Sequence, residues 1–291
     1  MSSDRLHERI RDQFSYRGSR ADIWKVFDSV LRTQEFLNLG YSPWYLPYFL
    51  GSTQRRLARR IGADLAARLS GTDDVRLLDI GCGRGGPAIH FADALGFDVS
   101  GVDLVPYNVT AARDNAVSQG VPAAFIVGDA MHLPIKPDSF RVCTALDSIV
   151  YVPEKQAVFD EMATVLCDGG VVALSDFVTC EGLSEAEVTV VDEYADAWDM
   201  PPVVSLDQYR RTIEQAGFTR LEVHDISPHS VARLRKWTAL YLRLVDGGLG
   251  KTVARLARRR GLNIATITEQ IRHAHKALPY LRHVNIYAQR G

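Results

Sequence analysis

The chain has 291 residues, of which 46% are hydrophobic and 24% charged, and its net charge is −1. These values are ordinary for a globular protein. No apolar run reaches the roughly 18 residues that a membrane-spanning helix needs, and the polar N-terminus lacks the apolar segment of a signal peptide. The four cysteines show no CxxC spacing, which argues against a disulfide framework or a zinc site. We therefore expect a cytoplasmic protein without a metal site.

The first 70 residues are predicted to form a helical cap and lid. Residues 19–33 carry one apolar stripe at helical spacing, and residues 54–69 carry another, in which leucine or isoleucine recurs every fourth residue. Between them, residues 38–52 read "NLGYSPWYLPYFLGS", a segment rich in aromatic residues and proline. A loop this apolar is rarely a plain surface loop, so we expect it to cover a site.

From residue 75 onward, short apolar strands alternate with amphipathic helices. Strands are expected at 75–80, 98–103, 123–127, 140–146 and 170–176, helices at 86–95, 106–118, 154–167 and 205–218, and two late strands at 220–227 and 283–289. This alternation is typical of an α/β fold, here a Rossmann-like, doubly wound, seven-stranded sheet with helices on both faces. The predicted division is an N-terminal helical cap over 1–70, a core over 71–228, a helical insertion over 229–280 and the final strand over 281–291.

The loop after the first strand reads "DIGCGRGG" and is the expected ligand-binding turn. Gly81 and Gly83 permit positive φ, and the helix that follows offers free N–H groups at its N-terminus. Asp103 ends the second strand, where a carboxylate can accept hydrogen bonds from ribose hydroxyls. The glycine spacing alone also fits a nicotinamide dinucleotide site. However, Asp79 before the turn would repel a pyrophosphate and attract an amino group, and Asp129 in "GDAMHLP" suits an amino-bearing heterocycle.

Several motifs together resemble the class I S-adenosylmethionine-dependent methyltransferases. "LLDIGCGRGG", "GVDL", "GDAMHLPIKPDSF" and "VLCDGGVVALSDF" occur in that family's order between Leu77 and Phe177. The resemblance implies S-adenosylmethionine as the cofactor, with the glycine turn around its methionine part and Asp79 beside its ammonium group. It also implies that Asp103 takes the ribose hydroxyls, while Asp129 and the Ala130 backbone hold the adenine. The expected cofactor-binding set is Asp79, Gly81, Cys82, Gly83, Gly85, Asp103, Leu104, Asp129, Ala130 and Leu146.

The segment "FLNLGYS" resembles the aromatic lid of small-molecule methyltransferases that act on sugars, tocopherols, sarcosine and polyketide or terpenoid products. The resemblance adds Tyr41 to the cofactor-binding set, because an aromatic face that closes over the sulfonium would attract its positive charge. In those relatives Asn, Gly and Tyr precede a Trp, whereas here Ser42 and Pro43 intervene before Trp44. A tyrosine packed within a hydrophobic cap is the alternative.

The expected position of a catalytic base departs from the family pattern. The fourth strand ends in "ALDSIVYVPE", which keeps the acid as Asp147 but has Val150 and Tyr151 where similar proteins commonly have histidine. The candidate catalytic residues are therefore Asp176 at the end of the fifth strand, Tyr151 and Asp147. An acceptor that needs no base, such as an amine, a phenol or an electron-rich carbon, stays open. So does an imidazole from a histidine at the late strand edges: His224, His229 or His283.

Basic residues gather towards the C-terminus. From Pro228 onward there are 13 Lys and Arg but only two Asp and Glu. Residues 231–245 predict a helix with an apolar stripe, and residues 252–260 predict an arginine-rich one. We expect this insertion to roof a pocket for an apolar or amphipathic small molecule, with the basic 251–260 region available to a membrane surface. Ordinary solvated helix faces are the alternative, and no motif points to nucleic acid.

The predicted function is S-adenosylmethionine-dependent methyl transfer to an oxygen, nitrogen or carbon atom of such a molecule. The alternative is a protein of the same fold that binds S-adenosylmethionine without methylating, as a cyclase or a non-catalytic partner would. The sequence leaves the oligomeric state open.

Overall fold

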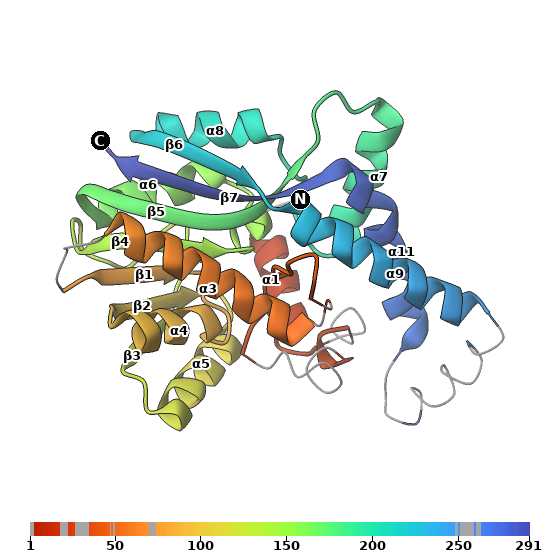
Figure 1. Ribbon diagram of the computed structural model, residues 1–291, viewed down its shortest axis with the longest axis horizontal. Helices are drawn as coiled ribbons and strands as arrows, with labels where there is room; N and C mark the ends of the chain where they lie inside the picture. The colour runs from red at the N-terminus through yellow and green to blue at the C-terminus, as the bar shows by residue number, and fades with distance from the viewer. Residues whose placement is uncertain are drawn as a thin grey trace.

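The computed structural model describes residues 3–17, 23–26, 35–46, 48, 50–69, 74–247, 250, 259 and 263–291. Its centre is a seven-stranded sheet in the order β3-β2-β1-β4-β5-β7-β6 (Figure 1). The strands are β1 (Arg76–Ile80), β2 (Asp98–Asp103), β3 (Ala123–Val127), β4 (Phe140–Leu146), β5 (Leu166–Thr179), β6 (Phe218–Asp225) and β7 (Leu281–Arg290). The first five strands are parallel, whereas β7 runs antiparallel between β5 and β6. The predicted Rossmann-like sheet is confirmed.

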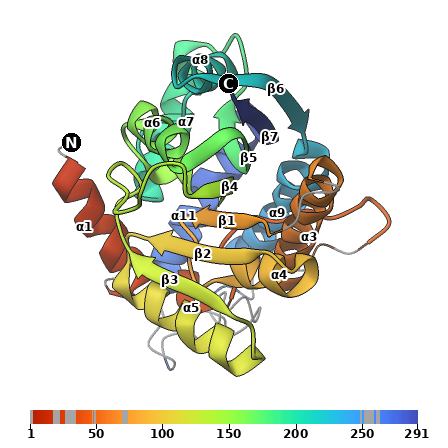
Figure 2. The ribbon, with the colours of Figure 1, turned by 90° about the vertical axis from the view of Figure 1, so that its left-hand side faces the viewer.

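Helices cover both faces of this sheet (Figure 2). One face carries α3 (Leu50–Arg68), α4 (Gly86–Leu95) and α5 (Pro106–Gln119), and the other carries α6 (Lys155–Val165) and α8 (Leu206–Gln215). Along β4, Val142 and Leu146 pack with the first group of helices, whereas Cys143 and Ala145 pack with the second. This burial on both faces explains why the central strands are nearly continuous apolar runs.

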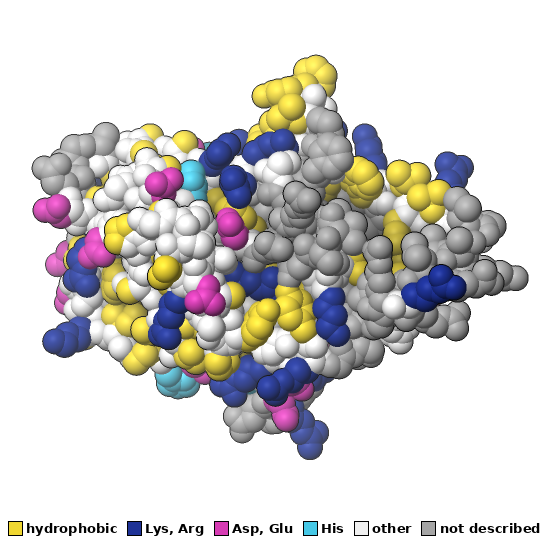
Figure 3. All heavy atoms as spheres, turned by 90° about the horizontal axis from the view of Figure 1, so that it is seen from below, with side chains coloured by type: hydrophobic (Ala, Val, Ile, Leu, Met, Phe, Trp, Pro, Cys, Tyr) yellow, Lys and Arg dark blue, Asp and Glu magenta, His cyan; other side chains and the backbone are white. Residues whose placement is uncertain are grey.

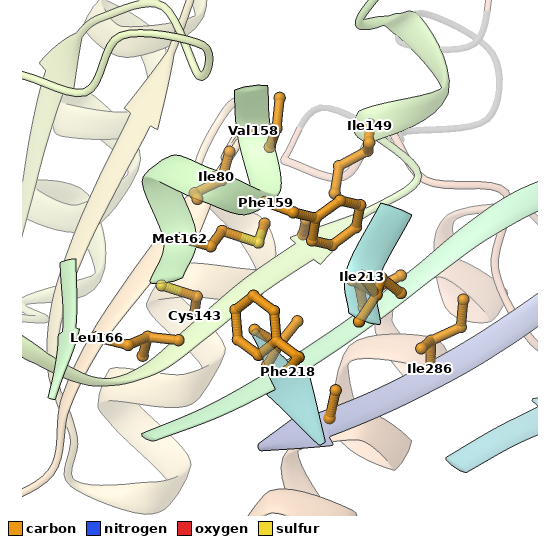
Figure 4. Packing of buried hydrophobic residues seen from close by; sticks show 14 of the residues in the cluster. Ile80, Cys143, Ile149, Val158, Phe159, Met162, Leu166, Ile213, Phe218 and Ile286 are labelled. Atoms are coloured by element: carbon orange, nitrogen blue, oxygen red, sulfur yellow. The ribbon is translucent and has the colours of Figure 1, made fainter. Parts of the chain in front are cut away.

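The core on the α6 and α8 face fixes the antiparallel edge of the sheet. Figure 4 shows Phe159 and Met162 of α6 directed toward Ile213 of α8 and Phe218 of β6. All four side chains are buried. Their packing holds α8 against the sheet and stabilises the edge strand β6, so that β7 is enclosed between β5 and β6. The position of β7 matters for the site described below.

Further helices gather at the carboxyl-terminal edge of the parallel strands (Figure 1). They are α1 (Ser3–Phe14), α7 (Glu185–Ala197), α9 (Val231–Asp246) and α11 (Ile264–Ala277), with the short 3-10 helices η2 (Ile149–Tyr151), η3 (Ser227–His229) and η4 (Leu278–Tyr280). Helix α11 packs against both α7 and α9. In the part of the chain that is described, no helix combines the length and apolarity needed to cross a membrane.

Most differences from the predicted elements lie at their boundaries. Strand β5 begins at Leu166, so it replaces the end of the helix expected over 154–167 and extends beyond the strand expected over 170–176. Of the helix expected over 19–33, residues 23–26 are described and are helical. The helix expected over 252–260 lies outside the described residues apart from Arg259. The division into cap, core and insertion stays a prediction.

Candidate active site

A cavity of about 120 Å³ lies at the carboxyl ends of β1, β2 and β4, where the strand order reverses. The predicted cofactor-binding residues that line it are Asp79, Gly81, Cys82, Gly83, Asp103, Leu104, Asp129, Ala130 and Leu146. Helix α1 also lines it, through His7, Ile10 and Phe14. Helix α1 is not among the elements or site residues predicted from the sequence, although Leu6, Ile10 and Phe14 are spaced as on one helix face. We call this space the first cavity.

The glycine turn has little space for side chains. Gly81 has φ +65°, and a Cβ added there would lie 2.4 Å from Cβ of Ser148. Ser148 is fixed in place, because its Oγ donates a 2.8 Å hydrogen bond to the carbonyl of Ile80. Gly83 has φ +52°, and its added Cβ would lie 3.1 Å from the Leu37 side chain of the lid. Glycine is therefore required by the backbone conformation at both positions, and by close packing at Gly81 above all.

Asp79 is a buried carboxylate that the protein satisfies only in part. Its Oδ1 accepts a 2.6 Å hydrogen bond from Thr144 Oγ1. Its Oδ2 is buried and meets no hydrogen-bond partner among the described residues. Burial raises the pKa of Asp79 to about 7, and the nearby Asp103 carboxylate adds to this effect. A cationic group in the first cavity would satisfy Oδ2, so the site fits the ammonium group of S-adenosylmethionine.

Asp103 is held in place by the glycine turn and the following helix. Its Oδ2 accepts from the Gly83 N–H at 2.8 Å, and its Oδ1 accepts from the Val105 N–H at 2.9 Å and from Asn108 Nδ2 at 3.2 Å. Burial raises the pKa of Asp103, although these hydrogen bonds oppose the effect. An oxygen with one donor can accept another, so Oδ2 keeps room for a ribose hydroxyl.

Asp129 and helix α1 line the part of the first cavity where the sequence predicts the adenine. Asp129 Oδ1 accepts a 2.9 Å hydrogen bond from the N–H of Met131, which fixes the turn after β3. Its Oδ2 lies 3.9 Å from Nδ1 of His7 on α1. The carboxylate is thus oriented by its own turn and lies at the cavity wall, and its contact with an exocyclic amine stays a prediction.

A second cavity of about 230 Å³ adjoins the first. Leu37, Asn38, Asp147 and Tyr151 line both of them. The remaining wall is mainly aromatic and aliphatic and includes Trp24, Leu39, Val150, Phe177, Tyr194, Trp198, Met200, Leu234, Trp237, Tyr241 and Ile271. Among the described lining residues, Asp147 is the sole charged side chain. The second cavity is therefore an apolar chamber with one carboxylate at its junction with the cofactor site.

Asp147 is fixed by donors from three parts of the chain. Its Oδ1 accepts from Ser175 Oγ at 2.6 Å and lies 2.8 Å from His283 Nε2, and its Oδ2 accepts from the Leu39 N–H at 2.6 Å. Burial raises the pKa of Asp147, but the charge of His283 and these hydrogen bonds outweigh burial and bring the pKa below its usual value. The carboxylate is thus ionised at neutral pH.

Three predicted site residues lie elsewhere, which corrects the sequence-based expectation. Asp176 is completely buried on the α6 and α8 face, where Tyr209 Oη donates to it at 2.8 Å, and it lines neither cavity. Burial raises its pKa to about 7. Tyr41 packs against the Arg60 guanidinium and the His229 ring instead of lining the first cavity.

Gly85 also lies away from the first cavity. It precedes α4 with φ +84°, and a Cβ added there would lie 3.1 Å from both Ala112 and Phe125. Its role in this structure is therefore to let the helix approach α5 and the sheet closely, which is a packing requirement.

The late histidines differ in their surroundings. His283 is completely buried and contacts Asp147, whereas the His229 ring packs at a tilt against Tyr41 and His224 lies near Glu222 at the surface. None of these three lines either cavity. The sequence leaves His283 as one option among several, and no pattern in it indicates the contact with Asp147.

This geometry defines a class of protein: a Rossmann-like protein with a cavity at the switch point that fits a cofactor and a mainly apolar cavity beside it. Residues 77–170 match the family described as "Methyltransferase domain". The chain is 31% identical over 208 residues to the methyltransferase GfsG of Streptomyces halstedii, covering 71% of this chain and 74% of that relative. It is 34% identical over 183 residues to 27-O-demethylrifamycin SV methyltransferase of Amycolatopsis mediterranei, covering 62% and 66%.

Among solved structures, the fold is similar to that of geranyl diphosphate C-methyltransferase from Streptomyces coelicolor A3(2). The TM-score is 0.72 at 16% identity, over 98% of each chain. The chain belongs to the S-adenosylmethionine-dependent methyltransferases. It is a small-molecule methyltransferase with S-adenosylmethionine as its cofactor.

The environment of Asp79 predicts that cofactor binding depends on pH. Because the pKa of Asp79 is about 7 and a bound cation lowers it, binding should release a proton below pH 7 and tighten as the pH rises to about 7. Asp79→Asn should abolish the proton release and weaken binding roughly tenfold or more, the scale of one charged hydrogen bond. Calorimetric titration with S-adenosylmethionine in buffers of different ionisation enthalpy measures both effects.

Two controls accompany this experiment. Asp98→Asn removes an exposed acid from the neighbouring strand and should leave binding unchanged. Because a raised carboxyl pKa makes the folded state lose stability as pH rises from the ordinary Asp value through 7, Asp79→Asn should also raise the melting temperature of the cofactor-free protein at pH 8. Wild-type proton release from Asp79→Asn would contradict the assignment.

Proposed function

We propose that this methyltransferase methylates a hydroxyl oxygen of an uncharged, largely apolar small molecule. The observation that carries the proposal is Asp147, a single ionised carboxylate at the junction between the cofactor site and an apolar chamber. An anionic group there favours an acceptor that donates a hydrogen bond and disfavours an anionic one. One relative has a name that specifies an O-demethylated acceptor, which supports oxygen as the methylated atom.

Bound S-adenosylmethionine supplies a methyl group already activated on a sulfonium, so the protein must align an acceptor and receive its proton. Asp147 suits this role because its Oδ2 has one donor, the Leu39 N–H, and can accept one more. A hydroxyl hydrogen-bonded to this oxygen would lose its proton to Asp147 as its oxygen takes the methyl group, whose bond to sulfur would break to leave S-adenosylhomocysteine. Tyr151 lines both cavities, so its side chain would make a second contact with the acceptor.

The composition of the second cavity supports an uncharged acceptor. Its described lining contains neither lysine nor arginine, so an anionic group would enter without compensation. In the part of the chain that is described, no group of three or more His, Cys, Asp or Glu side chains is arranged to hold a metal ion. Aromatic side chains from several elements, among them Trp24 and Trp198 with ring centroids 6.1 Å apart, would exclude water around the acceptor.

The predicted contact with a membrane concerns the outer surface of the lid and of the helices beside it. Trp44 and Tyr45 of the lid are exposed, and Arg233 of α9 donates to the carbonyls of Trp44 and Leu46 beside them. Figure 3 shows one face on which hydrophobic side chains lie among Lys and Arg. Contact of the basic 251–260 region with a membrane stays a prediction, because only Arg259 of that region is described. A cytoplasmic location and the absence of a nucleic-acid partner also stay predictions.

The role of Asp147 is tested by Asp147→Asn. The variant should lose roughly 100-fold or more in kcat, the usual contribution of a positioned proton acceptor, while cofactor binding stays within about threefold. The measurement is transfer of a deuterated methyl group to a panel of uncharged phenols and alcohols, read by mass spectrometry. Asp176→Asn decides between the two acids: a kcat loss there, with full activity in Asp147→Asn, would move the role to Asp176.

The apolar chamber is tested by Trp198→Ala. Removing this wall should raise the KM of an aromatic acceptor about tenfold, since burying a large side chain's contact area is worth about 1–3 kcal/mol. The matched control is Trp44→Ala, which removes an exposed tryptophan that lines neither cavity and should leave KM unchanged. Equal KM values for Trp198→Ala and wild type, with cofactor affinity and melting temperature intact, would place the acceptor elsewhere.

A further inference from the structure

His283 is a polar side chain enclosed in the sheet. It lies near the start of β7, opposite Phe177 of β5 in the antiparallel register. It is 0% exposed, and its ring stacks on the Phe177 ring at 4.7 Å and 11°. Its backbone is also fixed, since its N–H donates to Ser227 Oγ at 2.9 Å and its carbonyl accepts from the Ile226 N–H at 2.8 Å. The ring therefore has a single defined position.

The polar contact of that ring is directed to Asp147. His283 Nε2 lies 2.8 Å from Asp147 Oδ1, whereas Nδ1 is buried and meets no hydrogen-bond partner among the described residues. Leaving a buried ring nitrogen without a partner costs about 1–3 kcal/mol, so an apolar side chain stacked on Phe177 would be the simpler choice for stability. A histidine at this position is better explained by what it does for Asp147.

The carboxylate needs this contact to keep one orientation. Asp147 follows β4 in the left-handed region, with φ +55°, so its side chain leaves the sheet at a turn. Ser175 and His283 both occupy Oδ1, and the Leu39 N–H of the lid is the described donor to Oδ2. With Oδ1 saturated from the sheet side, the free accepting capacity of the carboxylate is confined to Oδ2.

We propose that His283 is a positioning residue for methyl transfer, which holds the Asp147 carboxylate so that Oδ2 receives the acceptor's proton. The inference rests on the proposed role of Asp147 as that proton acceptor. Positions 150 and 151 lack the histidine that the family resemblance implies. Here β7 brings an imidazole to the Asp147 carboxylate instead, from 136 residues further along the chain. His283 lines neither cavity, so it acts through Asp147 and not on the acceptor itself.

Paired substitutions at His283 separate positioning from packing. His283→Gln keeps an N–H group close to the position of Nε2, whereas His283→Leu fills a similar volume without a donor. We expect His283→Leu to lose about 10- to 100-fold in kcat, the effect of a misplaced catalytic group, with KM and cofactor affinity within about threefold. His283→Gln should recover most of the lost kcat. The assay uses the phenol or alcohol that the wild-type enzyme methylates best.

The control is Tyr287→Phe on the same face of β7. Tyr287 is buried and hydrogen-bonded to Asp64, a carboxylate remote from both cavities, so this variant loses a comparable contact without touching Asp147. It should lower the melting temperature while keeping the wild-type kcat. If His283→Leu does not fold, His283→Asn takes its place, because its shorter amide stays buried at the site but does not reach Asp147.

The outcomes distinguish this inference from the proposed function. Wild-type kcat in His283→Leu, or an equal kcat loss in His283→Gln and His283→Leu, would overturn the positioning role. A large kcat loss in Asp147→Asn alongside either result would leave the proposed function intact. Full activity in Asp147→Asn would instead refute the function of the carboxylate. If His283 acts through Asp147, the double variant Asp147→Asn/His283→Leu should be no slower than Asp147→Asn alone.

Discussion

The arrangement of the site depends on one buried ionised carboxylate and the three groups that surround it. A charge removed from water is costly unless it is paired and hydrogen-bonded, and Asp147 meets this requirement with Leu39, Ser175 and His283. These partners come from the lid, from β5 and from β7. The need to satisfy one charge therefore holds the lid against the sheet at the point where the first cavity meets the second. Displacing the lid would remove the described donor to Oδ2.

Asp79 shows the opposite arrangement on the neighbouring strand. Its side chain is buried too, but among the described residues it accepts a hydrogen bond only from Thr144, and the pKa of Asp79 is raised to about 7. Because this pKa is raised by burial, the folded protein loses stability as the pH rises from the ordinary Asp value through about 7, and the ionised carboxylate is destabilising above that pH. A ligand ammonium would reverse this cost. One carboxylate is thus satisfied by the protein and the other is left for a ligand, which assigns different tasks to two aspartates in the same crevice.

The position of several predicted site residues in the first cavity follows from local sequence patterns. The glycine turn, Asp79, Asp103 and Asp129 all lie at strand ends, and the strand pattern alone places them at one edge of the sheet. The side of the sheet on which Asp176 lies could not be predicted in this way. Neighbouring residues of a strand face opposite sides, so Ser175 and Phe177 reach the Asp147 side while Asp176 reaches Tyr209 on the other. A strand buried on both faces is apolar throughout and does not reveal which side a given residue takes.

The contact between Asp147 and His283 depends on the direction of β7. Because β7 is antiparallel, its first residues lie at the edge where the parallel strands β4 and β5 end, and the register pairs His283 with Phe177. A parallel strand at this place would bring its last residues there instead. The family resemblance implies an imidazole soon after β4. At that position this chain has Val150, which forms part of the apolar wall of the second cavity. Because the His283 imidazole contacts Asp147 from the sheet side, the described wall of the second cavity around this carboxylate stays mainly apolar, which suits the proposed methyl transfer since water would be excluded there.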